Sequence, residues 1–389
     1  MTAPRVPLAR TRPCHRERRL ARPTGAALML ALASALLIGP MGCGSDSEPP
    51  PSGATGSGAQ RTAAPAEVRL GYFANLTHAQ AVLGVSSGEL ARAVAPSTLV
   101  TRLFNAGPSL IEALFAGEVD IGYIGPGPAL NGFAKSRGQG LRIIAGAAAN
   151  GVAIVARPGA GIATLADLKG KRIATPQLGN TQDISARHYL VAELGQPDAD
   201  NVIPVPNAEQ ASMMANGEID AAWAPEPWGA LLVMKSGAVL LAEEKDLWPG
   251  KEFTLAVVIT TPQFLAAHPD LVRNVLRVHR GWTDRLNRDS ATYLPRLGDA
   301  LNALTGKGLP PEVFATAFAR TRFTDEPLES TLAAMAAWSY DLGFAKERPD
   351  LTGLVDTTIL RELEHAAPTA ANHATTPGGG VDAAPATAG

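Results

Sequence analysis

The chain has 389 residues, of which 46% are hydrophobic and 18% are charged, a composition typical of a globular protein long enough for two domains. Its only cysteines are Cys14 and Cys43, which excludes a disulfide framework, a zinc ribbon and an iron–sulfur site, so we expect no metal or other cofactor. Residues 1–42 hold seven Arg and one acid, which leaves 27 basic and 35 acidic side chains in residues 43–389. Because a nucleic-acid-binding protein needs a basic surface, we expect no nucleic-acid partner.

The first 42 residues have the layout of an export signal. Basic residues up to Arg22 precede the uncharged stretch 26–38, which is too short to span a bilayer as a mature helix but suits the core of a signal peptide. Met41-Gly42-Cys43 follows, and the small residue before the cysteine predicts a bacterial lipoprotein cleavage site with lipid on Cys43. An ordinary secretory cleavage is the alternative. The Arg18-Arg19 pair leaves general secretory and twin-arginine export both open.

Two segments contain almost no large apolar residues. Residues 43–65 and 366–389 consist mainly of Gly, Ser, Pro, Thr and Ala. Such segments bury too little surface to offset their conformational entropy, so we expect a disordered tether and a disordered tail around a folded part.

Strands alternate with helices in the folded part. The apolar runs predict strands at 68–73, 141–145, 152–157 and 171–175, and Pro269-Asp270 predicts the start of a long helix. This alternation indicates an α/β fold in which parallel sheets carry helices on their faces.

The chain also repeats itself at an offset of 100 residues. Residues 117–124 (GEVDIGYI) match 217–224 (GEIDAAWA), and each copy joins an apolar helix to a strand through a glycine able to adopt the left-handed conformation. The acidic residues of the repeat lie at turn-to-strand junctions, where structural capping is their expected role. The repeat predicts two α/β lobes with a ligand cleft beyond the carboxyl ends of their strands.

The strongest candidate site is 177–183 (QLGNTQD). It follows a strand, contains a flexible glycine and places Asn180 or Thr181 at the N-cap of a helix that includes 184–194. Backbone N–H groups at a helix start, with amide and hydroxyl side chains beside them, form a receptor for an anion. The alternative is a well-capped helix without a ligand. The turn 75–78 (NLTH) repeats this pattern in the first half.

Two further loops complete the candidate site. The Gly125-Pro126-Gly127 loop lacks the third glycine of a dinucleotide fingerprint and predicts a rigid bend with exposed N–H groups. Trp228 either lines an apolar pocket or packs in the core. Glu226 either faces away, bonded to an Arg or to backbone N–H groups, or meets an amine on the ligand. The candidate ligand-binding residues are Asn75, Thr77, His78, Gly125, Pro126, Gln177, Gly179, Asn180, Thr181, Gln182, Glu226 and Trp228.

Signatures of enzymes are absent from the sequence. The seven histidines include no pair at metal-ligand spacing on one helix, and neither a G-x-S-x-G elbow nor a phosphate-binding P-loop occurs. We therefore expect a binding protein without catalytic residues.

Several segments resemble the aliphatic sulfonate-binding proteins of the nitrate/sulfonate/taurine group of ABC-transporter solute receptors. The resemblance covers nearly all of 66–360, through 71–81, 104–129, 141–148, 171–183, 217–230, 246–250 and 323–332. It implies a type II periplasmic-binding-protein fold. We expect lobe 1 at 66–156, lobe 2 at 157–256, the completion of lobe 1 with C-terminal helices at 257–365, and hinge crossings near 149–160 and 253–262.

The resemblance also implies an ABC permease and ATPase as partners and an extracytoplasmic location, periplasmic or at the cell surface, with the lipid on Cys43 as the membrane anchor. We expect a monomer that captures a small organic anion, an aliphatic sulfonate above all. Taurine, nitrate, bicarbonate and pyrimidine precursors are the alternatives. Pyrimidine-precursor synthases share the fold, but they carry a cysteine-rich motif and this chain has no cysteine after Cys43. Since loops 74–80, 125–128, 177–183 and 225–228 contain no Lys or Arg, we expect neutral donors to hold the anion.

Overall fold

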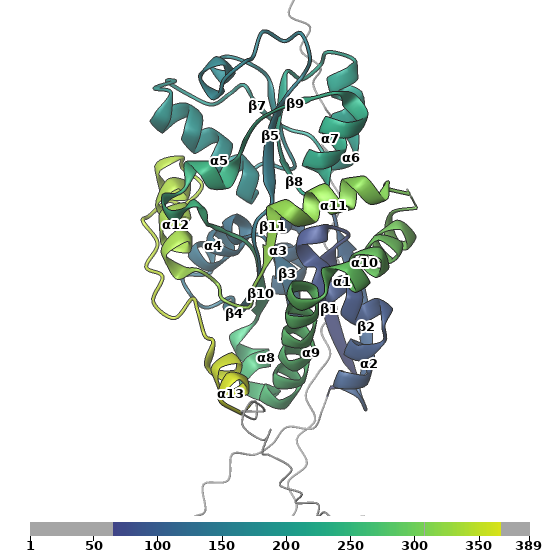
Figure 1. The fold of residues 1–389 in the computed structure, drawn as a ribbon. Coiled ribbons are helices and arrows are strands. Elements are labelled where there is room, and N and C mark those ends of the chain that lie inside the picture. Colours follow the sequence, from purple (N-terminus) through teal and green to yellow (C-terminus); the bar gives the residue numbers. More distant parts are fainter. Residues whose placement is uncertain (1–64, 307, 367–389) are drawn as a thin grey trace, which may run out of the picture. The chain divides into compact units, whose positions relative to one another are not determined.

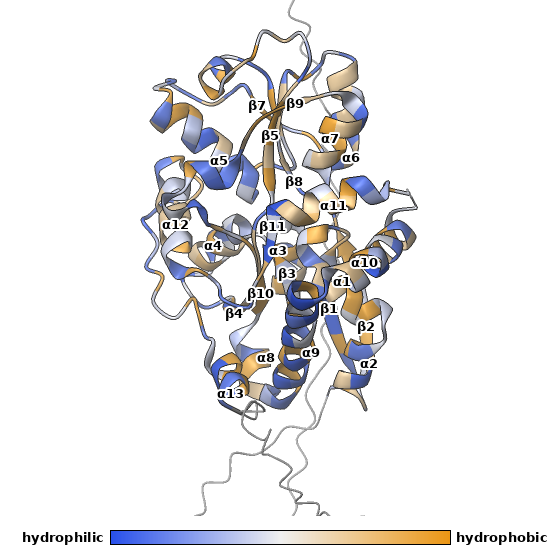
Figure 2. Cartoon of the chain, viewed as in Figure 1, coloured by the Kyte–Doolittle hydropathy of each residue, from blue (hydrophilic) through white to orange (hydrophobic). Residues whose placement is uncertain are grey.

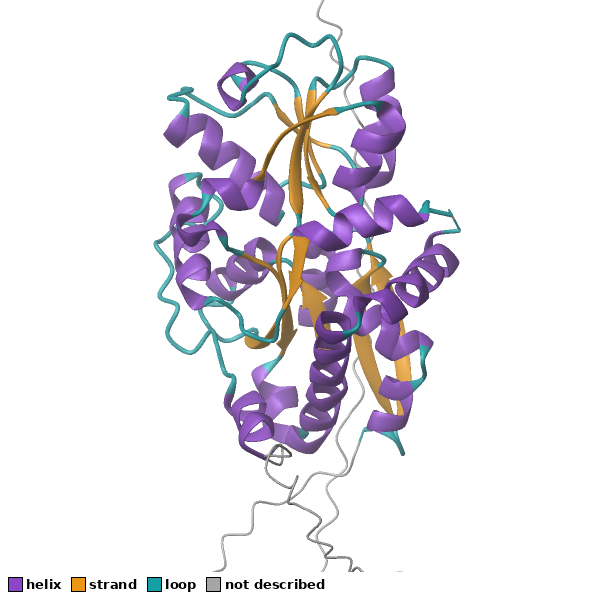
Figure 3. Cartoon of the chain, viewed as in Figure 1, coloured by secondary structure: helices purple, strands orange, loops and turns teal. Residues whose placement is uncertain are grey.

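The computed structural model describes residues 65–306 and 308–366. The expected signal segment, Cys43, the tether up to residue 64 and the tail from residue 367 lie outside this part. The described chain forms two sheets with helices packed on them (Figures 1 and 3). None of the described helices is long and apolar enough to cross a membrane.

The first sheet has six strands in the order β11-β4-β10-β3-β1-β2. They are β1 (Glu67–Phe73), β2 (Thr98–Phe104), β3 (Ile121–Ile124), β4 (Arg142–Asn150), β10 (Thr254–Thr260) and β11 (Thr321–Phe323). β1 is parallel to β2 and β3, whereas β10 is antiparallel to β3 and β4. All of β10 is buried, as expected for a continuously apolar strand in a sheet that is covered on both faces.

The second sheet has five strands in the order β7-β6-β8-β5-β9. They are β5 (Val152–Ala156), β6 (Ile173–Thr175), β7 (Val202–Pro204), β8 (Ala221–Pro225) and β9 (Val239–Glu243). β6 is parallel to β7 and β8, and β5 is antiparallel to β8 and β9. Both sheets are therefore mixed rather than parallel, because a strand that crosses over from the other sheet enters in the opposite direction.

Helices cover both faces of each sheet. On the first sheet they are α1 (Ala79–Ser86), α2 (Glu89–Val94), α3 (Gly107–Phe115), α4 (Pro126–Lys135), α8 (Pro262–Ala267), α9 (Pro269–Arg288), α10 (Ser290–Thr305), α11 (Pro311–Arg320), α12 (Glu329–Asp341) and α13 (Thr358–Ala366). On the second they are α5 (Thr181–His188), continued by the π-helical turn η3 (Tyr189–Glu193), α6 (Asn207–Ala215) and α7 (Trp228–Ser236). β5 and β10 are coloured mainly hydrophobic, whereas helices such as α9 and α10 carry both colours (Figure 2). α9 begins at Pro269, as predicted, and buries Leu271, Val275, Trp282 and Leu286.

Three apolar clusters form the core. One lies between α1, α9 and α10 and the first sheet, and includes Leu70 and Val275. A second lies on the opposite face of that sheet and continues into the second sheet, where it includes Ile154 and Trp223. A third packs α6 and α7 on the remaining face of the second sheet. Because one cluster joins the two sheets, the strand ends that border the cleft are supported by packed side chains on both sides.

The boundaries between the lobes differ from those expected. β5 belongs to the second sheet, although we placed residues up to 156 in lobe 1, and β10 belongs to the first sheet from residue 254, before the expected return at 257. The first crossing lies between β4 and β5, where Gly151 has a φ of 74°. Strands buried on both faces show no alternation of apolar and polar residues, so the sequence does not indicate where the chain passes from the first sheet to the second.

The repeat is confirmed as a structural feature. Gly117 and Gly217 have φ values of 71° and 72° and stand before β3 and β8, respectively. Three residues later, Asp120 accepts hydrogen bonds from the backbone N–H and the guanidinium of Arg69, and Asp220 does the same for Arg172. These carboxylates tie neighbouring strands together, which agrees with their expected structural role.

We expect Asp120→Asn and Asp220→Asn each to lower the free energy of unfolding by about 1–3 kcal/mol, because an amide is a weaker acceptor for a guanidinium than a carboxylate. The hydrogen bond from Arg172 lowers the pKa of Asp220, so its stabilisation is present at neutral pH and declines as the pH falls below about 4. Urea denaturation at pH 7 and pH 3 measures both effects. Glu118→Gln and Glu218→Gln, at exposed positions of the same repeat, are the controls, and equal losses in all four variants would contradict the prediction.

Candidate functional site

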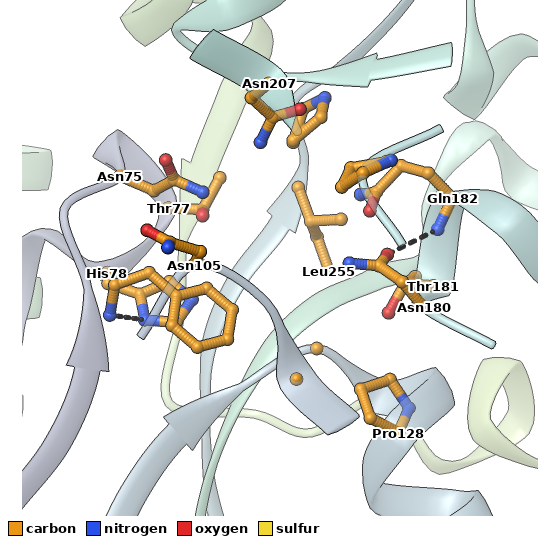
Figure 4. Close-up of a pocket in the computed structure, with 15 residues that line it drawn as sticks. Asn75, Thr77, His78, Asn105, Pro128, Asn180, Thr181, Gln182, Asn207 and Leu255 are labelled. Carbon is orange, nitrogen blue, oxygen red and sulfur yellow. Dashed lines mark hydrogen bonds between the residues drawn. The ribbon is translucent and has the colours of Figure 1, made fainter. Parts of the chain in front are cut away.

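The largest set of predicted site residues meets in a small cavity between the two sheets. Asn75, Thr77 and His78 follow β1, and Asn180, Thr181 and Gln182 begin α5 on the opposite side (Figure 4). Gly125 lines the same cavity. Residues from the two halves of the repeat therefore reach one site because the carboxyl ends of β1, β3 and β6 all face it.

The start of α5 is fixed by two side chains. Asn180 is the N-cap, and its Oδ1 accepts the Gln182 N–H at 3.0 Å. The fully buried carboxylate of Asp183 accepts the Gly179 N–H at 2.9 Å and pairs with the Arg187 guanidinium at 3.0 Å. Gly179, with a φ of 72°, allows the turn. The first backbone N–H groups of a helix have no acceptor within the helix. Asn180 accepts one of them, from Gln182, and the others at the start of α5 can donate to a ligand.

His78 provides a neutral donor on the other side of the cavity. Burial lowers its pKa to about 3, so the ring is neutral at physiological pH. Its Nδ1 accepts the Phe73 N–H at 3.2 Å, which leaves the ring proton on Nε2. The ring also stacks on Phe73, with 4.5 Å between centroids, and this contact holds its orientation.

The two sides of the cavity are in close contact at Thr181. A Cβ at Gly125 would lie 2.4 Å from Thr181 Oγ1, and the Gly127 N–H donates to that oxygen at 3.2 Å. The Thr181 hydroxyl therefore accepts a hydrogen bond from the first lobe and keeps its own proton for a ligand. Glycine is required at 125 by this close approach.

The cavity is uncharged. Its other lining residues are Phe73, Asn105, Gly107, Pro128, Pro176, Asn207, Pro225 and Leu255, so neither Lys, Arg, Asp nor Glu is among them. Its polar groups are amides, hydroxyls, one neutral imidazole and backbone N–H groups. Such a site can bind a singly charged anion through hydrogen bonds alone.

An outer groove of about 720 Å³ adjoins the cavity and shares Phe73, Asn75, Asn105, Pro176 and Asn207 with it. Trp228 and Gln177 line this groove rather than the inner cavity. The Trp228 indole N–H donates to Asn75 Oδ1 at 2.9 Å, which joins the two lobes across the mouth of the cleft. Pro126 and Gly179 support the loops without lining either space.

Glu226, a predicted ligand-binding residue, lies outside both the cavity and the groove. Its side chain is fully buried, accepts the Arg320 guanidinium at 2.9 Å and the Ala230 N–H at 2.9 Å, and lines neither the cavity nor the groove. Burial raises its pKa, which the Arg320 pair opposes. Of the two orientations considered from the sequence, the structure has the one that faces away from the ligand.

Asn105 and Asn207 were missed by the sequence analysis. Asn105 directly follows β2, whose carboxyl end faces the cleft. A predicted strand at 98–104 would therefore have indicated Asn105 as a candidate site residue. Asn207 is the first residue of α6, and two residues separate it from the end of β7. Within the part of the chain that the structure describes, no cluster of three His, Cys, Asp or Glu side chains is arranged to hold a metal ion.

We expect Glu226→Gln to lower the free energy of unfolding by about 1–3 kcal/mol, because the Arg320 guanidinium loses its nearest carboxylate in a buried setting. Glu252→Gln is the matched control, since Glu252 pairs with Arg322 at the surface, where a pair contributes under about 1 kcal/mol. Urea denaturation compares the two. Full stability of Glu226→Gln would show that the ion pair is not structural.

Comparison with known proteins places this fold among binding proteins. A proposed binding protein of Brucella abortus is 31% identical over 180 residues, 46% of this chain and 54% of that protein. A proposed aliphatic sulfonates-binding protein of Bacillus subtilis is 26% identical over 271 residues, 67% of this chain and 76% of that protein. The chain thus spans about half the length of the Brucella relatives that it matches.

The solved alkanesulfonate-binding protein of Xanthomonas axonopodis pv. citri, bound to MOPS, is similar with a TM-score of 0.64 and 25% identity over 76% of this chain and 99% of that chain. This likeness confirms the expected two-lobed periplasmic-binding-protein fold. The model of the NMT1-like family matches residues 61–293, more than half of the chain. The chain therefore belongs to the NMT1-like family.

Proposed function

We propose that this protein is the extracytoplasmic substrate-binding component of an ABC importer and that it captures an aliphatic sulfonate. The observation that carries the proposal is the uncharged cavity between the two sheets, lined by neutral hydrogen-bond donors at the start of α5 and after β1. The named relatives are binding proteins, and the permease and ATPase partners follow from that role.

A sulfonate head matches this cavity for electrostatic reasons. It carries a single negative charge at any physiological pH and offers three oxygens, each an acceptor. The Thr181 hydroxyl, the first-turn N–H groups of α5 and the neutral His78 ring supply donors from both lobes. A doubly charged anion would call for a cationic side chain, which the lining lacks.

The outer groove favours a ligand with an organic tail. It is lined by Phe104, Leu103, Pro206 and Trp228, which suits an alkyl chain and exceeds what nitrate or bicarbonate needs. Taurine would place an amine in this groove, where Glu209 is the only carboxylate that lines it, since Glu226 is paired with Arg320. Taurine, nitrate, bicarbonate and pyrimidine precursors are therefore secondary candidates.

The connections between the lobes support a cleft that opens and closes. Two crossings, β4 to β5 and β9 to β10, join the sheets. The Trp228–Asn75 hydrogen bond bridges the lobes at the mouth, and the buried Gly127–Thr181 hydrogen bond bridges them beside the inner cavity. In this account the lobes separate to admit the ligand and close on it, a population shift between two states. The protein acts as a monomer that the permease recognises when closed.

We expect ethanesulfonate to raise the melting temperature of residues 65–366, and Thr181→Val to weaken its binding by about 1–3 kcal/mol, because the hydroxyl that would donate to the head is lost. Thr181→Ser keeps the hydroxyl and is the matched control. Titration calorimetry with taurine, nitrate, bicarbonate and sulfonates of increasing chain length measures both. Equal affinities of Thr181→Val and Thr181→Ser for ethanesulfonate would show that the anion does not bind at the start of α5.

Trp228→Ala should weaken the binding of long-chain sulfonates more than the binding of ethanesulfonate.

For the lipid anchor on Cys43, we expect mass spectrometry of membrane-extracted protein to find an N-terminal diacylated cysteine at this position. Cys43→Ala should release the protein into the soluble fraction, whereas Cys14→Ala, within the expected signal segment, should not. A wild-type chain recovered without lipid from the soluble fraction would contradict the anchor and favour ordinary secretory cleavage.

A further inference from the structure

A second cavity, of about 170 Å³, lies farther along α5 from the inner cavity. It is formed by α5, η3, β8, the short helix η4 (Glu244–Leu247) and α12. It shares no lining residue with the inner cavity or the outer groove. The proposed function makes no use of it.

A buried carboxylate forms part of its wall. Glu244 is 1% exposed, and its two oxygens accept the indole N–H groups of Trp223 at 2.6 Å and Trp248 at 3.2 Å. Among the described residues, no Lys or Arg lies within ion-pair distance of Glu244. Burial raises its pKa to about 6, against the effect of these hydrogen bonds, so it is mainly charged at pH 7.5. The result is a buried negative charge without a counter-ion.

A hydroxyl group lies beside this carboxylate. The Ser185 side chain is 4% exposed, lines the cavity with Glu244 and lowers the pKa of that carboxyl, but it makes no hydrogen bond of normal distance and angle within the described part of the chain. The exposed Glu193 adds a second negative charge at the rim, and neither Lys nor Arg lines the cavity. Trp248, Trp338 and Tyr189 supply aromatic walls.

We propose that this cavity is a binding site for a small primary ammonium ion. An alkylammonium group has three N–H donors and one positive charge, and the site offers three acceptors in the two Glu244 oxygens and the Ser185 oxygen. Each Glu244 oxygen accepts one indole N–H and retains a further lone pair for the ligand. The alkyl part lies against the aromatic walls, which also attract a cation through their ring faces.

An acceptor for two indole N–H groups is a simpler role for Glu244, but it leaves two features unexplained. A neutral amide oxygen satisfies an indole N–H without a buried charge, and burying an unpaired charge is unfavourable. A buried hydroxyl without a hydrogen bond of normal geometry, as at Ser185, is likewise unfavourable. A bound ammonium ion removes both penalties.

The test is a titration of the protein with ethylammonium chloride at pH 7.5, followed by calorimetry and by tryptophan fluorescence, with sodium chloride of equal ionic strength as the blank. We expect saturable binding, at least tenfold weaker in Glu244→Gln and several-fold weaker in Ser185→Ala. Tetramethylammonium, with the same charge but without N–H donors, should bind at least tenfold more weakly than ethylammonium. Glu252→Gln, at the surface and outside all three cavities, is the matched control and should bind ethylammonium as the wild type does.

Four results would overturn the proposal: no saturable binding above the sodium chloride blank, equal or tighter binding of tetramethylammonium, unchanged affinity in Ser185→Ala, or loss of binding in Glu252→Gln. If Glu244→Gln fails to fold, the Ser185→Ala variant and the tetramethylammonium comparison still test the proposed ammonium site. Ethanesulfonate binding in each variant reports separately on the first site, so failure of this proposal leaves the proposed function untouched.

Discussion

The site depends on one buried carboxylate, that of Asp183. It accepts hydrogen bonds from the Gly179 N–H and the Thr175 hydroxyl and pairs with Arg187, which in turn donates to the backbone carbonyls of Ala199 and Val202. One side chain thus connects the end of β6, the loop before α5, the helix itself and the chain that leads into β7. Because the pairing with Arg187 neutralises its charge, Asp183 can hold this loop next to an anion without repelling it.

The rest of the cavity follows from that anchor. With the loop fixed, the first turn of α5 presents its N–H groups and the Thr181 hydroxyl to the other lobe, where Gly125 leaves room for Thr181. His78 completes the set as a neutral donor, because burial lowers its pKa to about 3 and so keeps the ring uncharged. Under the proposed function, an anion held by dipoles rather than by cations can leave without an ion pair having to be broken.

Features coded by adjacent residues could be predicted from the sequence. The N-cap at Asn180 needs only the sequence around it, and the left-handed turns at Gly117 and Gly217 are visible in the repeat. Features that depend on distant partners could not. Glu226 is bonded to Arg320, 94 residues away, so its orientation was undecidable from its own loop. The strand at 152–157 was predicted, but its place in the second sheet was not, because strands buried on both faces lack the alternation that would show which sheet they join. The π-helical turn that continues α5 was not predicted either.

The central claim is that neutral donors at the start of α5 hold a sulfonate between the two lobes. A crystal structure of residues 65–366 with ethanesulfonate tests it most directly. The account predicts sulfonate oxygens within about 3 Å of the Thr181 hydroxyl and a first-turn N–H of α5, with the ethyl group directed toward Trp228 in the outer groove. A sulfonate bound elsewhere, held by an Arg or Lys side chain, would contradict it.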